Sequence, residues 1–156
     1  MQLNSAASAK FTMIDIRELT AVDYDDVISL WESTEGVRLR DADKKENMEQ
    51  YLLPNPGLSF AARKDGHIVG AVLCGHDGRR GYLHHLAVAK AYRRQGIATA
   101  LVSRCLAQLR LIGIEKCHLF VLEKNAEAQK FWQKLGWSER TDIKMMSLNM
   151  SNSFNI

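Results

Sequence analysis

The sequence predicts a mixed α/β domain whose elements follow the order β-α-α-β-β-β-α-β-α-β. Three observations carry this prediction. Short hydrophobic segments separated by turn residues fill the first half of the chain, a helical period begins near residue 95, and an apolar run with a second helical period follows it. The 156 residues suit one domain. We expect it to span residues 13–150, between a flexible leader (1–12) and a short tail (151–156).

The first half of the chain predicts one strand, two helices and a meander of three strands. Ile14 and Ile16 alternate with polar residues, which is typical of a strand. The Asp-Gly pairs at 65–66 and 77–78 supply the tight turns that join the three later strands. The predicted elements are a strand at 13–19, a helix opened by Asp23, a polar helix at 42–53, and strands at 58–63, 67–75 and 82–88.

The second half changes period at Gln95, where hydrophobic residues begin to recur at helical spacing over about four turns. Gly113 ends that helix, since a left-handed glycine is a common helix end. His118–Leu122 is almost wholly apolar, which is typical of a buried strand. Asn125 then supplies a good N-cap for a further helix, and a last strand is predicted within 143–149.

Composition excludes several classes of protein. A hydrophobic content of 46% and a charged content of 25% are ordinary for a globular chain, and no apolar run approaches the ~20 residues of a membrane span. The first residues lack the pattern of a secretory signal. Cys74, Cys105 and Cys117 form no C-x-x-C pair and lie in apolar stretches. They indicate reduced, buried thiols in a cytoplasmic protein, because no neighbouring group would activate a nucleophilic cysteine.

The net charge of +3 is unevenly distributed along the chain. Residues 1–78 carry 8 Lys/Arg and 13 Asp/Glu, whereas residues 79–156 carry 13 and 5. The acidic half suits a cationic partner and the basic half a polyanion. A surface of merely solvated charges is the alternative interpretation.

The stretch from Val88 to Thr99 reads as a strand end, a short basic loop and a helix that begins at a glycine. The first N–H groups of a helix lack internal partners and attract phosphates. Gly96 lets a ligand approach the backbone, and Arg93 and Arg94 add forked donors. Neither a P-loop nor a dinucleotide-binding glycine pattern is present. The stretch therefore predicts a pyrophosphate site, and an ordinary helix capped by a basic loop is the alternative.

Two motifs resemble the signatures of the GNAT superfamily of N-acetyltransferases. Leu86-Ala87-Val88 followed by residues 92–98 (YRRQGIA) is similar to [QR]-x-x-G-x-[GA] after an L-x-V strand end. Residues 125–137 (NAEAQKFWQKLGW) are similar to N-x-x-A-x-x-F-Y-x-x-x-G-[FW]. The resemblance spans about residues 13–149. It implies the GNAT fold, a central, mostly antiparallel mixed sheet flanked by about four helices.

The resemblance also implies an activity. The chain would transfer an acetyl group from acetyl-CoA to a primary amine by direct attack in a ternary complex, and the acceptor would be a small-molecule amine or a protein N-terminus or lysine. It implies acetyl-CoA and the acceptor as partners, no metal, no nucleic acid and no membrane, and a monomer or homodimer. A CoA-binding regulatory module without turnover is the alternative. A nucleic-acid-binding domain using the basic half is a third class, but the aromatic stacking platform is missing.

The resemblance assigns the cofactor residues. The backbone of Leu86–Val88 would pair with the pantetheine amides as an added strand, and the N–H groups from Arg94 to Thr99 would hold the pyrophosphate. The central strands would separate after the L-x-V position and so make room for the thioester. The predicted cofactor-binding residues are Leu86, Ala87, Val88, Arg93, Arg94, Gln95, Gly96, Ile97, Ala98, Thr99, Asn125 and Trp132.

Two histidines on the strand before the cofactor are candidates for the base. A lysine-type amine has a pKa near ~10.4 and is mostly protonated at neutral pH, so an acceptor near ~6.5 helps to remove its proton. Since neighbouring strand residues point to opposite faces, we expect only one of His84 and His85 to face the substrate, and no shared metal site. A family member with a histidine at the equivalent position favours His84. A water chain with both imidazoles structural is the alternative.

Trp132 departs from the family pattern, because many GNAT enzymes have there a Tyr that protonates the departing thiolate. An indole cannot do this, so the general acid is unassigned. By resemblance, the acceptor site comes from the first two helices and their connecting loop. The candidates are Trp31, Glu32 and, on the strand, Tyr82. Further acidic residues nearby suit a cationic amine, although a solvated polar face explains them equally well; they are Glu35, Asp41 and Asp43.

Overall fold

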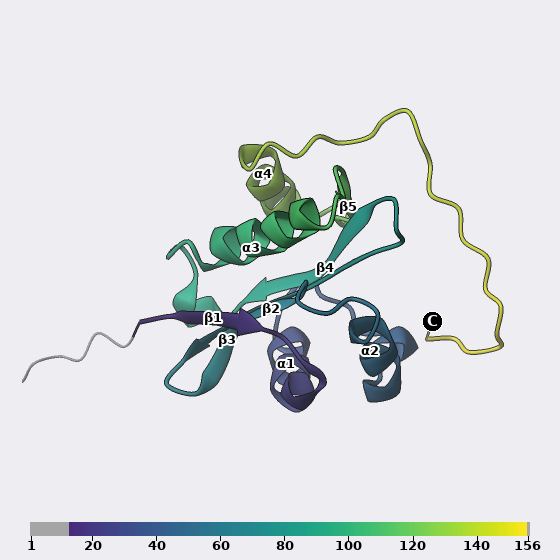
Figure 1. Cartoon of the computed structure of the whole chain (residues 1–156). Helices are drawn as coiled ribbons and strands as arrows, with labels where there is room; N and C mark the ends of the chain where they lie inside the picture. Colours follow the sequence, from purple (N-terminus) through teal and green to yellow (C-terminus); the bar gives the residue numbers. More distant parts are fainter. Residues whose placement is uncertain (1–12, 156) are drawn as a thin grey trace, which may run out of the picture.

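The computed structural model describes residues 13–155, so the expected leader lies outside the described part. A mixed sheet separates two layers of helices, with α3 and α4 on one face and α1 and α2 on the other (Figure 1). The strands are β1 (Asp15–Glu18), β2 (Phe60–Lys64), β3 (His67–His76), β4 (Gly81–Val88) and β5 (Cys117–Leu119). The helices are α1 (Tyr24–Glu32), α2 (Lys45–Leu52), α3 (Ile97–Leu111) and α4 (Ala126–Lys134), with short 3-10 turns η1 (Ala21–Asp23), η2 (Asp41–Asp43) and η3 (Lys90–Tyr92).

The strands lie in sequence order, β1 to β5, and all neighbours are antiparallel except β4 and β5. The β2–β3 turn has φ values of 51° at Asp65 and 80° at Gly66, which an Asp-Gly pair adopts readily in a tight hairpin. The long helix α3 carries the chain back across the sheet, so β5 enters parallel to β4. The predicted fold class, a mostly antiparallel mixed sheet flanked by helices, is confirmed.

The core occupies both faces of the sheet, because the central strand β3 is covered on each side. Val72 and Cys74 pack with Leu101 on the α3 face. Ala71 and Leu73 pack with Trp31 of α1 on the other face. Strands buried on two faces are expected to be continuously apolar, and residues 69–75 are all buried.

Two predictions for the last third of the chain are wrong. No strand forms within 143–149. Residues 138–155, here called the arm, run without helix or strand from α4 to the neighbourhood of η2 (Figure 1). The run 118–122 is a strand only through Leu119, and the side chain of Phe120 is 62% exposed. Within residues 13–155 no strand pairs with residues 120–122 or with 143–149, and a strand pattern becomes a strand only where a neighbouring backbone supplies hydrogen bonds.

The cysteines follow the prediction more closely. Cys74 and Cys105 are buried, Cys117 is partly buried, and all three thiols are free. Burial raises the pKa of the Cys117 thiol to about 12, so this group stays protonated at neutral pH. Among the helices of residues 13–155, none has the length and hydrophobicity needed to cross a bilayer. The cytoplasmic location stays a prediction.

Candidate active site

The loop before α3 presents main-chain amides to solvent. Arg94 and Gly96 have positive φ angles of 60° and 78°, and alternation of such residues with ordinary ones turns successive N–H groups toward a common point. The first helical bond runs from Ala100 N to Gly96 O, at 3.0 Å. The amides before it therefore lack a partner within the helix, and no side chain of the described residues caps this end. A Cβ at Gly96 would meet nothing within 4 Å, so a ligand can approach.

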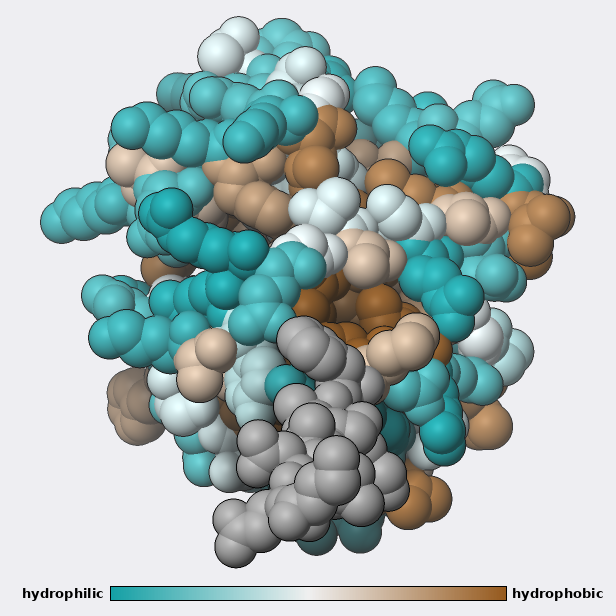
Figure 2. Space-filling view, turned by 90° about the vertical axis from the view of Figure 1, so that its left-hand side faces the viewer, coloured by the Kyte–Doolittle hydropathy of each residue, from teal (hydrophilic) through white to brown (hydrophobic). Residues whose placement is uncertain are grey.

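Arg93, which the sequence predicts to bind the cofactor, also makes a hydrogen bond within the protein. Its Nε donates to the carbonyl oxygen of Val88, at 3.1 Å, which closes the loop between β4 and α3. Arg94 is exposed beside it. On the face that contains this loop, hydrophobic residues gather in a hollow between the α3 side above and the α1 side below (Figure 2).

One edge of β4 is open next to this loop. Pairing between β4 and β5 covers only Gly81 to Leu83. From His84 to Val88 the edge of β4 that faces away from β3 has no strand partner in the described chain. The strands thus separate before Leu86-Ala87-Val88, and the prediction that they separate after these residues is wrong. Pairing stops there because β5 ends at Leu119, opposite Leu83. The regular pleat of β4 is also interrupted directly after His84.

The interruption is a β-bulge. Leu73 pairs with His84 and Ala71 pairs with Ala87, so two residues of β4 lie opposite the single Val72. His85, the first of the two, has a φ of 53°. This left-handed conformation turns its side chain to the face on which His84 already lies. The expectation that the two imidazoles point to opposite faces is therefore wrong, because it assumed a regular strand.

His84 is surrounded by aromatic rings. The centroid of its ring lies 6.4 Å from that of Tyr82, 6.0 Å from Tyr51 on α2, and 6.3 Å from Phe120 beyond β5. Burial, reinforced by the neighbouring His85, lowers the pKa of His84 below its ordinary 6.5. The imidazole is therefore neutral at pH 7 and able to accept a proton.

His85 is held by residues of the α1–α2 layer. Its Nε2 lies 2.7 Å from Oδ1 of Asp43 in η2, and its ring packs at 5.1 Å against that of Trp31. Burial tends to raise the pKa of Asp43, but hydrogen bonds from His85 and from the amide of Arg40 outweigh it and hold the pKa below 3.8. The carboxylate is charged at neutral pH, and it fixes both the loop and the imidazole.

The side chains of three other predicted residues lie in different surroundings. Trp132 is 9% exposed and lies edge-on to Phe131 and Trp137 in the α3-side core. Trp31 is fully buried beneath His85, whereas Glu32 is exposed on α1.

Asn125 caps α4, since its Oδ1 accepts from the Ala128 amide at 3.0 Å. Its Nδ2 lies 3.0 Å from the place that a Cβ of Gly36 would occupy. Asn125 therefore brings the start of α4 close to the loop that follows α1.

Sequence reasoning missed the roles of Tyr51, Phe120 and the Asp43 carboxylate. Each reaches the histidines through tertiary contacts. The aromatic residues of 118–122 and the acidic residues near 43 were the available signals. No group of three or more His, Cys, Asp or Glu residues within 13–155 is arranged to hold a metal ion.

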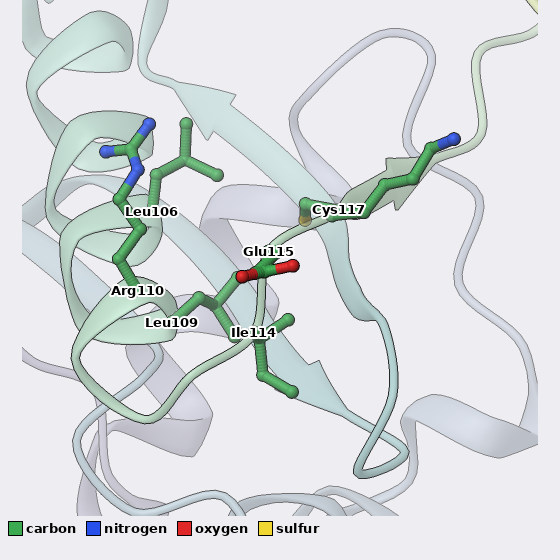
Figure 3. Close-up of a pocket in the computed structure, with 7 residues that line it drawn as sticks. Leu106, Leu109, Arg110, Ile114, Glu115 and Cys117 are labelled. Atoms are coloured by element: carbon green, nitrogen blue, oxygen red, sulfur yellow. The ribbon is translucent and has the colours of Figure 1, made fainter.

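A second hollow lies elsewhere and is unconnected with this chemistry. It is formed between the later turns of α3 and β5, with Leu106, Arg110 and Cys117 among its lining residues (Figure 3). The helix rises about 1.5 Å per residue, so this hollow is more than about 10 Å along α3 from Gly96. It is no part of the predicted cofactor site.

Comparison with known proteins identifies the family. The model of the acetyltransferase (GNAT) family matches residues 24–137. An acetyltransferase of Pectobacterium atrosepticum is 37% identical over 122 residues, which are 78% of this chain and 86% of the relative. The fold matches a GNAT-family acetyltransferase of Staphylococcus aureus, with a TM-score of 0.73, 22% identity, and coverage of 85% of this chain and 90% of that one. It also matches the PaiA N-acetyltransferase of Thermoplasma acidophilum in complex with coenzyme A, with a TM-score of 0.70, 19% identity, and coverage of 79% and 88%.

Proposed function

The chain belongs to the GNAT acetyltransferase family and is an acetyl-CoA-dependent acetyltransferase, and we propose that its acceptor is a primary amine on a small cationic molecule. One observation carries the proposal: an uncapped helix N-terminus, an open strand edge and a neutral imidazole adjoin one another along a single stretch of chain. The predicted cofactor and catalytic residues are part of the same proposal.

The cofactor assignment is supported by two backbone features. The free amides from Arg94 to Thr99 suit a diphosphate, because donors and helix dipole act together there. The open edge of β4 from His84 to Val88 can accept the pantetheine amides as an added strand. An extended ligand laid along this edge would have its far end beside His84. Acetyl-CoA supplies the activated acyl group at that end.

His84 is proposed as the base. When the amine nitrogen attacks the thioester carbonyl, the carbon–sulfur bond breaks and the nitrogen must lose a proton. The neutral imidazole of His84 accepts this proton, directly or through a water. His85 is less suited to the role, because its Nε2 is already engaged by Asp43. The residue that protonates the thiolate is unassigned, since Trp132 lies in the core.

The proposed class of acceptor follows from the side chains that surround His84. Tyr51, Tyr82 and Phe120 offer ring faces and edges, which attract an ammonium group through their electron-rich faces. The helices on this side of the sheet carry the acidic half of the chain, including the charged Asp43. These features favour a compact cation over a neutral amine. A protein N-terminus or lysine is the competing acceptor.

A panel of amines tests the proposal. Release of free thiol from acetyl-CoA would be measured with polyamines, amino acids, aminoglycosides and peptides with free N-termini, with hydrolysis in the absence of amine as the blank. We expect the highest kcat/KM with small amines that carry more than one positive charge. Turnover confined to peptides would contradict the acceptor class, and CoA binding without turnover of any amine would favour a regulatory module.

A further inference from the structure

Four aromatic side chains stand together on the α1–α2 side of β4 and β5. Tyr82 pairs in register with His118 of β5, and the centroids of their rings are 5.7 Å apart. Two residues further along each segment, the rings of His84 and Phe120 lie 6.3 Å apart, with planes 24° from parallel. The rings of Tyr82 and His84 are parallel to within 7°, at 6.4 Å. These four residues form what we term the ring cluster, and the proposed base is one of them.

The ring cluster is accessible to a ligand. Phe120 is 62% exposed, and Tyr82, His84 and His118 are each partly exposed. From α2, which lies on this side of the sheet (Figure 1), Tyr51 meets His84 edge-on, at 6.0 Å and 77°. An aromatic face left in water beside a reactive group is a surface suited to a bound molecule.

The helix layer beside the ring cluster is negatively charged. Residues 20–55, which contain α1, η2 and α2, carry nine Asp/Glu and four Lys/Arg. Burial lowers the pKa of His84, and the nearby Asp43 carboxylate acts on it in the opposite direction, so its charge is felt within the ring cluster. Both oxygens of Asp43 are already engaged, Oδ1 by His85 at 2.7 Å and Oδ2 by the Arg40 amide at 2.8 Å. Asp43 therefore contributes a field that attracts a cation, rather than a contact that binds one.

Aromatic rings in a negative field suit a flat cation better than a compact one. An ammonium group is strongly hydrated, and it needs hydrogen-bond acceptors when it leaves water. Phe120 offers no acceptor, and Tyr82 offers a single hydroxyl oxygen. A guanidinium is planar and more weakly hydrated, and it stacks on aromatic faces. On the exposed ring of Phe120 it can do so while its N–H groups stay in water.

We propose that the acceptor is a primary amine that carries a guanidinium group, which stacks on the ring of Phe120 while the amine lies at His84. A short alkyl chain joins the two groups, in keeping with the 6.3 Å between the two rings. The inference rests on the proposed function, whose reaction is unchanged. The amine nitrogen bonds to the acetyl carbon, the carbon–sulfur bond breaks, CoA leaves as the thiolate, and the proton passes to His84. A guanidinium has a pKa of about 12.5 or above and keeps its charge, so only the amine is acetylated.

Four amines of matched length test the proposal on the full chain. Agmatine carries the guanidinium, cadaverine has an ammonium in its place, hexylamine has a methyl group, and 4-phenylbutylamine has a flat ring without charge. We expect kcat/KM at pH 7 to be about 3–30-fold higher for agmatine than for cadaverine, the range that a cation–π contact gives. Phe120→Leu should bring this ratio close to one. Phe154→Leu is the matched control, because Phe154 is fully exposed on the arm, and it should keep the wild-type ratio.

The outcomes separate this inference from the function on which it rests. Equal kcat/KM for agmatine and cadaverine, or a higher value for 4-phenylbutylamine than for agmatine, overturns the guanidinium and leaves acetylation of small amines in place. A preference for agmatine that survives Phe120→Leu overturns the stacking, provided that CoA binding shows the variant to be folded.

If none of the four amines is acetylated, the proposed acceptor class fails, and binding then decides the inference. Calorimetric titration of the CoA-bound protein with agmatine and with cadaverine supplies this measurement. Tighter binding of agmatine that is lost in Phe120→Leu supports the guanidinium site. Equal binding of the two amines, or no binding of agmatine, overturns it.

Discussion

Replacing Gly96 by Asp tests the diphosphate site most directly. Gly96 begins α3 with a φ of 78°, and a Cβ there would meet no atom within 4 Å. The backbone cost of a side chain in this conformation is about 1–2 kcal/mol, and for Asp it is partly offset by about 1 kcal/mol of helix capping. The chain should therefore fold, with a fall in melting temperature of a few degrees at about 2–4 °C per kcal/mol.

Binding should respond far more strongly than stability. A carboxylate at this position would lie close to a bound phosphate, and we take a separation of about 6 Å for the Coulomb energy. With an effective dielectric constant of about 20, the repulsion is about 3 kcal/mol for each unit of charge, which corresponds to at least a hundredfold loss of affinity at about 1.4 kcal/mol per tenfold. The carboxylate would also occupy the amides that the diphosphate needs.

Calorimetric titration with CoA measures this loss, with Gly96→Ala separating strain from charge. Gly113, with a φ of 82° and open space around it, lies beyond the other end of α3. Gly113→Asp is thus the matched control, and it should leave CoA affinity unchanged. Affinity of Gly96→Asp within about threefold of Gly96→Ala, where about 0.7 kcal/mol is at stake, would refute the placement.

The other predictions use the same protein and simple assays. Because the pKa of His84 lies below 6.5, kcat/KM should fall as the pH drops through that lowered value. His84→Gln should remove this limb, lower the rate at pH 7 by about 10²–10⁴-fold and recover toward the pKa of the amine; an equal loss at every pH would point to a structural role. Asn125→Ala should cost about 1 kcal/mol through the lost N-cap and also weaken CoA binding; an unchanged melting temperature would contradict the cap. The pKa of Asp43 in the folded protein is held below 3.8. The ionised carboxylate therefore stabilises the fold above that pH, and this contribution is lost as the pH falls through the folded-state pKa. Asp43→Asn should therefore flatten the acid limb of the stability profile, and an identical acid limb would contradict this.

The turn and helix signals were predictable because they are local. The Asp-Gly hairpin, the glycine that begins α3 and the Asn125 cap each depend on the backbone preference of one or two residues. Motif spacing also predicted the loop that we propose for the cofactor, and this loop lies between β4 and α3. No long-range information was needed for these features.

What the sequence could not predict depends on partners distant in the chain. Asp43 and His85 are 42 positions apart and meet only in the tertiary structure, and an extra residue in β4 shows itself only through its pairing with β3. The pattern of 143–149 predicted a strand, and that prediction is wrong. Whether a backbone lies beside it is a property of the fold or of an assembly.

The bulge at His85 has a practical consequence for anyone who aligns or re-engineers this strand. The extra residue shifts the alternation of side chains along β4 by one position. Residues 81–84 therefore point to the two faces of the sheet in one alternation, and residues 86–88 in the opposite one. A one-residue deletion there would restore a uniform pleat and leave the later side chains on their present faces, but it would remove one of the two imidazoles from the α1–α2 side. In alignments and in grafting, the two halves of β4 are best treated as separate segments joined by His85, whose φ is positive.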